Sequence, residues 1–205
     1  MGTGSLTLLD WRRRTAALYA AVRAEPDPVV AHGLWRRGRD ALFTEHPDSP
    51  LLPGDPRRGR GLPVAPYDPA LRFTAPVEPA PAQDLSVTTG TDGTVVFTRT
   101  GRARTPLGTL DLWWLTGYGG GLWVPVRDGS SGRTSYGGGR YLLDTVKGAD
   151  LGTTEGTGGG TAGEELVLDL NFLYAPSCAY DPDWACPLAP PGNRLEAAVE
   201  AGELG

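Results

Sequence analysis

Leu85-Ser86-Val87-Thr88, then Thr91-Asp92-Gly93, then Val95-Val96-Phe97-Thr98-Arg99 form the stretch from which the fold class can be read. The two outer runs are rich in apolar and β-branched residues and the middle run is typical of a turn, so the stretch predicts a β-hairpin. Further strands are expected at 110–115, 122–126, 140–143 and 166–170, with a turn at 101–108. Short strands at this spacing predict a mainly β protein, an antiparallel barrel or sandwich.

Residues 6–45 have a different pattern, which predicts one or two N-terminal α-helices. An approximate helical stripe is formed by Leu8, Trp11, Leu18, Tyr19 and Val22. Thr7 followed by Asp10 resembles a capping box at the start of the first helix.

A second helix is expected after the break at 25–28. Asp27 is its expected N-cap and Pro28 its first residue. His46 is expected to end it, because the residue before a proline avoids the helical region. The expected apolar face of this helix consists of Val30, Leu34, Ala41 and Leu42.

The chain therefore divides into an N-terminal helical segment, 1–46, and a β domain, 47–205, which we expect to form one integrated domain. Long Gly- and Pro-rich loops are predicted at 47–83 and 148–163, with short edge strands at 61–64 and 71–73 inside the first.

Charge and hydropathy exclude several classes of partner. The formal net charge is −5 and the sequence has no long basic run, which argues against nucleic acid or an anionic membrane as a partner. No apolar stretch reaches the roughly 18 residues of a membrane span. The N-terminus lacks a basic start followed by an apolar core, so no secretory signal is predicted and a cytoplasmic location is expected.

Arg127 and Arg140 are candidates for binding a small anionic ligand. If 122–128 and 134–143 pair as a hairpin, the two guanidinium groups stand near each other and near Gly-rich backbone, as in a carboxylate or phosphate clamp. Further candidate ligand-binding residues from the same region and the C-terminal third are Asp128, Tyr136, Asn171 and Asn193. The alternative is a structural network in which a buried arginine is paired with Asp128 or Asp169.

Cys178 and Cys186 are the only cysteines and are separated by seven residues. This spacing is unlike a zinc site, so neither a metal nor a cofactor is predicted. Pro182 and Pro187 bend this loop, so a disulfide or two adjacent thiols are expected. A catalytic thiol remains an alternative, which would require a base such as His46 nearby.

A hydrolase is the alternative function, with catalytic candidates Asp169, Cys178, Tyr136 and Tyr180. Asp128 and Asp169 also form a candidate carboxylate pair for acid–base chemistry. In a third reading, these polar residues only brace a long C-terminal loop.

Several of these motifs occur together and in one order. They are His46-Pro47-Asp48-Ser49-Pro50-Leu51, Val124-Pro125-Val126-Arg127-Asp128 with Ser131-Gly132, Tyr136-Gly137-Gly138-Gly139-Arg140-Tyr141-Leu142, and Asp169-Leu170-Asn171 through Asn193-Arg194-Leu195. Over roughly residues 35 to 203, the chain resembles an uncharacterised prokaryotic family known as domain of unknown function 1684.

The resemblance implies no activity, because the family has none established. The chain departs from the family pattern at Thr134, where relatives tend to carry Glu, and at 175–178, where Ala-Pro-Ser-Cys replaces Asn-Pro-Tyr-Cys. The function is therefore left as unknown, with binding of a small anionic ligand as the leading hypothesis.

Overall fold

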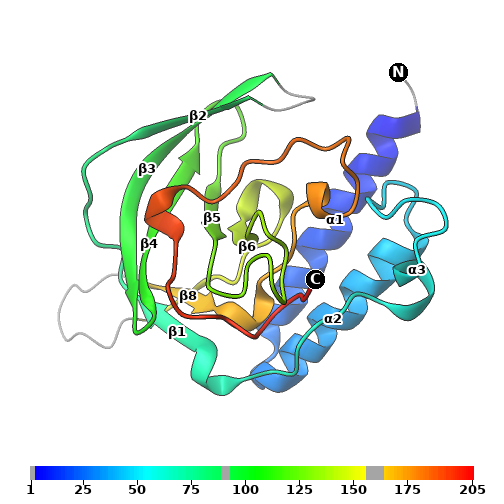
Figure 1. Ribbon diagram of the computed structural model, residues 1–205, viewed down its shortest axis with the longest axis horizontal. Coiled ribbons are helices and arrows are strands. Elements are labelled where there is room, and N and C mark those ends of the chain that lie inside the picture. The colour runs from blue at the N-terminus through cyan, green and yellow to red at the C-terminus, as the bar shows by residue number, and fades with distance from the viewer. Residues whose placement is uncertain (1–2, 89–92, 156–163) are drawn as a thin grey trace.

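The computed structural model of the chain describes residues 3–88, 93–155 and 164–205 (Figure 1). Its largest element is a five-stranded antiparallel sheet in the order β2-β3-β4-β5-β6. The strands are β2 (Asp84–Thr88), β3 (Thr94–Thr105), β4 (Gly108–Leu115), β5 (Leu122–Val126) and β6 (Arg140–Asp144). Each strand pairs with the next along the chain, so local hairpins build the sheet.

A second, three-stranded antiparallel sheet has the order β1-β8-β7. It joins β1 (Arg72–Ala75), β8 (Glu165–Asp169) and the short β7 (Thr153–Thr154). Arg72 pairs with Asp169 in this sheet, so segments almost a hundred residues apart meet. Both sheets are open within the described residues, so the arrangement is sandwich-like and the closed-barrel alternative is wrong.

The helices α1 (Thr3–Ala24) and α2 (Pro28–Glu45) lie together on the side of the molecule opposite β2, β3 and β4, and β6 lies between (Figure 1). Tyr19 and Val22 of α1 and Trp35 of α2 belong to the same buried apolar cluster as the strands. The N-terminal helices therefore share one hydrophobic core with the sheets. A four-residue helix, α3 (Arg57–Arg60), follows in the Pro-rich connection.

The predicted limits of α2 are confirmed. The Asp27 side chain accepts hydrogen bonds from the backbone N–H groups of Val29 and Val30, Pro28 is the first helical residue, and His46 is the C-cap. The predicted start of the first helix is wrong, because α1 begins at Thr3 and Thr7 lies inside it.

The buried face of α2 also differs from the predicted one. Val30 and Ala41 are exposed, while the buried residues are Ala31, His32, Trp35, Arg39, Leu42 and Phe43. The apolar pattern of the sequence did not predict this face, because the face includes two polar residues, His32 and Arg39. Both form hydrogen bonds inside the protein.

Strands β2, β5 and β6 confirm the hairpins expected from the sequence, whereas β3 is longer than predicted. It continues past a register shift between Arg99 and Gly101 to Thr105, so most of the expected turn at 101–108 is strand. The 61–64 segment forms only an isolated bridge, from Val64 to Glu203. The expected turn residues Thr91 and Asp92, and 156–163 of the expected loop, lie outside the described residues.

Trp113 and Trp114 face opposite sides of β4, as strand alternation predicts. The exposed fraction is 1% for Trp113 and 45% for Trp114. Trp113 packs with Phe97, Trp123 and Tyr141 in a second apolar cluster, so it belongs to the core. Within the described residues, no helix combines the length and apolar character needed to cross a bilayer.

Candidate functional site

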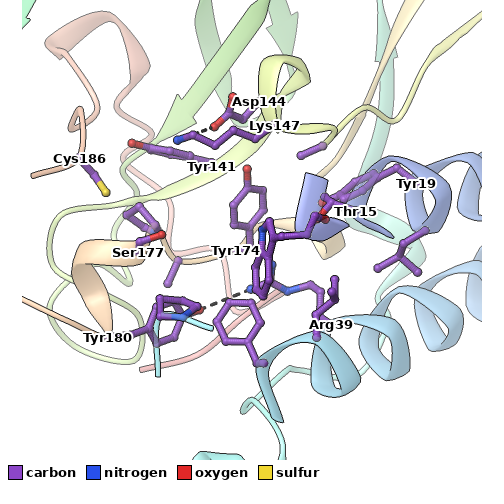
Figure 2. A pocket seen from close by; sticks show the side chains of 18 residues that line it. Thr15, Tyr19, Arg39, Tyr141, Asp144, Lys147, Tyr174, Ser177, Tyr180 and Cys186 are labelled. Atoms are coloured by element: carbon purple, nitrogen blue, oxygen red, sulfur yellow. Dashed lines mark hydrogen bonds and ion pairs between the residues drawn. The ribbon is translucent and has the colours of Figure 1, made fainter. Parts of the chain in front are cut away.

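A pocket lies where α1 and α2 face the end of β6 and the chain that follows β8 (Figure 2). Its volume is about 80 Å³, roughly half the 150 Å³ of an engineered cavity that binds benzene. Its walls combine aromatic rings, apolar side chains and a few polar groups. They are Trp11, Thr15, Leu18, Tyr19, Arg39, Leu42, Phe43, Pro50, Tyr141, Asp144, Lys147, Ala149, Tyr174, Ala175, Pro176, Ser177, Tyr180 and Cys186.

Arg39 of α2 is the cation at the base of this pocket. Its Nη2 donates to the Glu203 carboxylate at 2.7 Å, and its guanidinium lies over the rings of Trp35, Phe43 and Tyr174 at 4.8 to 5.3 Å from their centroids. Burial alone lowers the pKa of Arg39, but the charge of Glu203 together with the nearby tyrosines outweighs burial, and the pKa is raised. The Nε of Arg39 is buried and has no hydrogen-bond partner in the described part of the chain.

Glu203 holds three parts of the chain together beside the pocket. Besides Arg39, its carboxylate accepts hydrogen bonds from the Tyr180 hydroxyl and from the backbone N–H of Ala175. Burial raises the pKa of Tyr180 well above its ordinary value, and the Glu203 charge adds to this effect. Tyr180 is therefore a protonated donor to Glu203 at neutral pH.

Tyr19 and Tyr174 bring hydroxyl groups to the pocket. Tyr19 accepts a hydrogen bond from Trp35 Nε1 at 3.0 Å, which leaves its own O–H free to donate. The Tyr174 ring stands between Arg39 and the pair Asp144–Lys147, with its hydroxyl toward that pair (Figure 2). Burial raises the pKa of Tyr19 to about 12 and that of Tyr174 well above its ordinary value, so both stay protonated.

The opposite rim is formed by the end of β6 and the short helix η2 (Thr145–Lys147). Lys147 Nζ lies 3.2 Å from the carboxylate of Asp144, whose charge raises the pKa of the lysine. The Tyr141 hydroxyl donates to the backbone carbonyl of Pro187 at 2.5 Å. This bond holds the segment that carries Cys186 against the pocket.

Cys178 lies in the short helix η4 (Ser177–Ala179), and Cys186 lines the pocket. Both are free, half-buried thiols, and their side chains interact with each other. The Tyr136 hydroxyl donates to Cys178 Sγ at 3.5 Å. The hydrogen bond with Cys186 is the largest cause that lowers the pKa of Cys178 to about 6, with Tyr136 contributing, while the pKa of Cys186 is raised. The described residues hold no cluster of three metal-ligating side chains.

The glycine run after Tyr136 explains how its ring reaches Cys178. A Cβ at Gly138 would lie 2.5 Å from Cε1 of Tyr136, so only glycine allows the ring to fold over its own backbone. Gly139 has φ +90°, and a Cβ there would meet the Val126 carbonyl at 2.7 Å.

Arg140 and Arg127 do not form a common site, although β5 and β6 pair as predicted with Val126 opposite Arg140. Arg140 is fully buried and donates to the Asp128 carboxylate at 2.9 Å, and to the backbone carbonyls of Val199, Ala201 and Glu203. The Arg127 side chain is exposed. The backbone N–H of Arg127 donates to the Asn193 carbonyl, and the Arg127 carbonyl accepts from the Leu195 N–H. These two hydrogen bonds tie the chain after β5 to the C-terminal segment.

Asp128 is one of several candidates that occupy buried hydrogen-bond networks. Burial alone raises its pKa, but hydrogen bonds from Ser130 and Val199 and the charge of Arg140 outweigh this, so the pKa of Asp128 is lowered. Val199 N–H donates to the same carboxylate at 3.0 Å.

Asp169 and Asn171 form a separate network. Asp169 is fully buried, accepts hydrogen bonds from Tyr67, Arg72 and Asn171, and shares no partner with Asp128. Asn171 exchanges hydrogen bonds with the backbone of Asp68 at 2.7 and 2.8 Å. The two carboxylates are thus each bound to their own set of groups and do not face each other as an acid–base pair.

Asn193, in the short helix η5 (Pro191–Asn193), links the C-terminal segment to β4. Its side chain accepts from Trp113 Nε1 at 2.8 Å and donates to the Asp111 carbonyl at 2.8 Å. Like Asn171, it is fully buried and pins one segment to another.

Sequence reasoning missed most of the pocket. Arg39, Lys147 and Tyr174 come from three distant segments, and no local motif connects them. One signal was present: Arg39 lies one turn from Trp35 and Phe43 on α2, and an arginine between large aromatic residues of one helical face is a candidate for burial.

Three comparisons with known proteins bear on identity. The family model described as "Protein of unknown function (DUF1684)" matches residues 59–204. Among solved structures, the chain is similar to an uncharacterized protein of Haloarcula marismortui determined by solution NMR. The identity is 32%, the match covers 83% of this chain and 90% of that chain, and the TM-score is 0.57. No curated protein matches the chain.

The matched residues include the Cys178–Tyr136 contact, the Arg140 network, Tyr174 and Glu203, whereas Arg39 precedes the matched range. The family model spans well over half of the chain, and its description gives no activity. On these findings, the chain belongs to the DUF1684 family of proteins of unknown function.

Proposed function

We propose that this protein binds a small carboxylate in the pocket between α1, α2 and β6. The observation that carries the proposal is the set of unused donors on Arg39, Tyr19 and Tyr174 at one pocket of aromatic walls. Small-molecule sites commonly combine such walls with a few convergent polar groups.

The hydrogen-bond donors that line the pocket indicate which chemical class of ligand would fit. The O–H groups of Tyr19 and Tyr174 have no acceptor in the described part of the chain, and the Arg39 Nε has no partner. Hydroxyl and guanidinium donors complement a ligand that offers only acceptors, as a carboxylate does. Glu203 already neutralises Arg39, so the ligand is held by hydrogen bonds more than by net charge.

The size of the pocket sets a limit on the ligand. A volume of about 80 Å³ suits a carboxylate with a few further heavy atoms. The residues first identified from sequence then have a structural part. Arg140, Asp128 and Asn193 brace the C-terminal segment that supplies Glu203, whereas Asn171 holds the chain at Asp68.

The test compares Tyr174→Phe with wild type in titrations with acetate, lactate, benzoate and inorganic phosphate. Binding is followed by protein-observed NMR. We expect saturable binding of at least one carboxylate and an affinity about five- to tenfold weaker in the variant, since one hydrogen bond contributes about 1 kcal/mol. Tyr118→Phe is the matched control, because Tyr118 is fully exposed and lines no part of the pocket.

The proposal fails if no probe binds saturably to the wild-type protein. It also fails if a carboxylate binds but Tyr174→Phe and Tyr118→Phe have the same affinity as wild type. A preference for phosphate over every carboxylate would support a binding site in this pocket but would contradict the proposal that its ligand is a carboxylate.

A further inference from the structure

Cys178, Cys186 and Tyr136 lie beside the pocket, which only Cys186 of the three lines, and they take no part in the binding just described. They come from η4, from the Pro-rich segment after it, and from the turn before β6. We propose that Cys178 and Cys186 form a peroxide-oxidised thiol pair, in which Cys178 reacts first and Cys186 then closes an intramolecular disulfide. The proposal does not require the pocket to bind any ligand.

The fold brings the two thiols into one region. Cys186 lines the pocket together with Ser177, the residue before Cys178 in η4 (Figure 2). Both thiols are free and half-buried, and the chain between them is short and bent by Pro182. The Tyr141–Pro187 hydrogen bond keeps Cys186 in place. A resolving thiol beside the reactive one is the arrangement found in redox-sensing cysteines.

The two thiols have different surroundings. Cys178 receives hydrogen bonds from two groups, Cys186 and Tyr136, and these stabilise its thiolate. Thiolates, not thiols, attack peroxides. The Tyr136 hydroxyl, 3.5 Å from Cys178 Sγ, assigns the attacking role to Cys178 and the resolving role to Cys186, and the lowered pKa of Cys178 agrees with this assignment. Within the described part of the chain, the titratable groups that act on the pair are Tyr136, Tyr141 and Lys147.

The reaction balances with hydrogen peroxide or an organic hydroperoxide as the oxidant. The Cys178 thiolate attacks one peroxide oxygen, the O–O bond breaks, and water or an alcohol leaves after taking up a proton. Cys178 is now a sulfenic acid. The Cys186 sulfur attacks the Cys178 sulfur, the S–O bond breaks, the S–S bond forms, and a second water leaves. The peroxide is reduced by two electrons and the thiol pair is oxidised by two.

The experiment treats the reduced full-length protein with a small excess of hydrogen peroxide and follows free thiols and intact mass. We expect both thiols to disappear together, the mass to fall by two hydrogen atoms, and dithiothreitol to reverse both changes. Cys186→Ser is expected to stop at a sulfenic acid on Cys178 that dimedone traps. Cys178→Ser is expected to react much more slowly, because the remaining thiol lacks a stabilised thiolate.

Tyr136→Phe tests the positioning role of the phenol, with Tyr118→Phe as control. If loss of the hydrogen bond raises the pKa of Cys178 from about 6 to about 7, the thiolate fraction at pH 6 falls about fivefold, and the oxidation rate with it. The effect should shrink as the pH rises, because the thiolate then predominates in both proteins. An equal rate at pH 6 in wild type and Tyr136→Phe would contradict this role.

Three outcomes would overturn the thiol pair itself. One is oxidation of the two cysteines independently to sulfinic acids with no disulfide. Another is disulfide formation only between two molecules. The third is a disulfide present after purification that dithiothreitol cannot reduce in the folded protein, which would make the bond permanent and structural.

Discussion

Arg140 shows how much of one molecule can depend on a single side chain. Its guanidinium binds Asp128 and three backbone carbonyls at alternate residues of the C-terminal segment, and none of it is exposed. A buried ion pair contributes little by itself, but removing one partner leaves the other charge buried and unpaired.

We therefore expect Arg140→Ala to lower the free energy of unfolding by about 3–5 kcal/mol. Urea denaturation followed by tryptophan fluorescence measures the change. Arg127→Ala is the matched control and should change stability by less than about 0.5 kcal/mol, because this side chain is exposed. Equal small effects in the two variants would show that the Arg140 network does not hold the C-terminal segment.

For individual residues, the sequence predicted which polar side chains would be fixed by several contacts, but it did not predict what those side chains contact. Asp128, Arg140, Asp169, Asn171 and Asn193 are all buried polar residues with several partners. Polar residues crowded between glycines and prolines predict that side chains will be fixed there. Whether a fixed side chain faces a ligand or another segment depends on contacts across the fold, which the spacing does not contain.

The start of α2 is an element whose local signals were sufficient. Asp27 accepts hydrogen bonds from Val29 N–H at 2.8 Å and Val30 N–H at 3.3 Å, and Pro28 supplies the backbone angle of the first turn. The position of Arg39 follows from where this helix begins.

Asp27→Ala is expected to cost about 1 kcal/mol of stability, because two backbone N–H groups lose their acceptor. Asp27→Asn should cost only a few tenths of a kcal/mol, since the amide oxygen can cap the helix in the same way. Thermal unfolding followed by circular dichroism compares the two. If Asn is as destabilising as Ala, charge rather than capping is the cause.

The strands were predicted from local pattern with similar success, and the exceptions have physical reasons. β3 passes through Gly101, where a Cβ would lie 2.6 Å from Cγ1 of Val77. The glycine that suggested a turn instead permits a close approach of the chain at 77–78, which bonds to Arg102. β7 has only two residues, and it is a strand because it pairs with β8. Two residues are too few for the alternating apolar pattern that predicts a strand.

Across the whole molecule, Glu203 connects the helical and β parts. It binds Arg39 of α2, Tyr180 after η4 and the backbone of Ala175, and only 2% of it is exposed. The pocket therefore depends on a residue that is not among those lining it.

We expect Glu203→Ala to destabilise the protein by about 3–5 kcal/mol, because Arg39 would stay buried without its counter-charge. Glu200→Ala is the control, because Glu200 is exposed and its partner among the described residues is Thr134. Its loss should cost less than about 0.5 kcal/mol. Guanidinium chloride unfolding of both variants gives the comparison. A Glu203 variant as stable as wild type would mean that Arg39 is neutralised in another way.

The contacts of Arg39 and Arg140 also determine which part of the fold can form only at the end of synthesis. The ribosome releases the helices and the whole five-stranded sheet before residues 199–203 appear, so Arg39 still lacks its carboxylate and Arg140 has Asp128 but not its three carbonyl acceptors. Burying guanidinium donors without these partners is unfavourable. We therefore expect the nascent protein to leave this region open, and the pocket to form only after residue 203 has emerged.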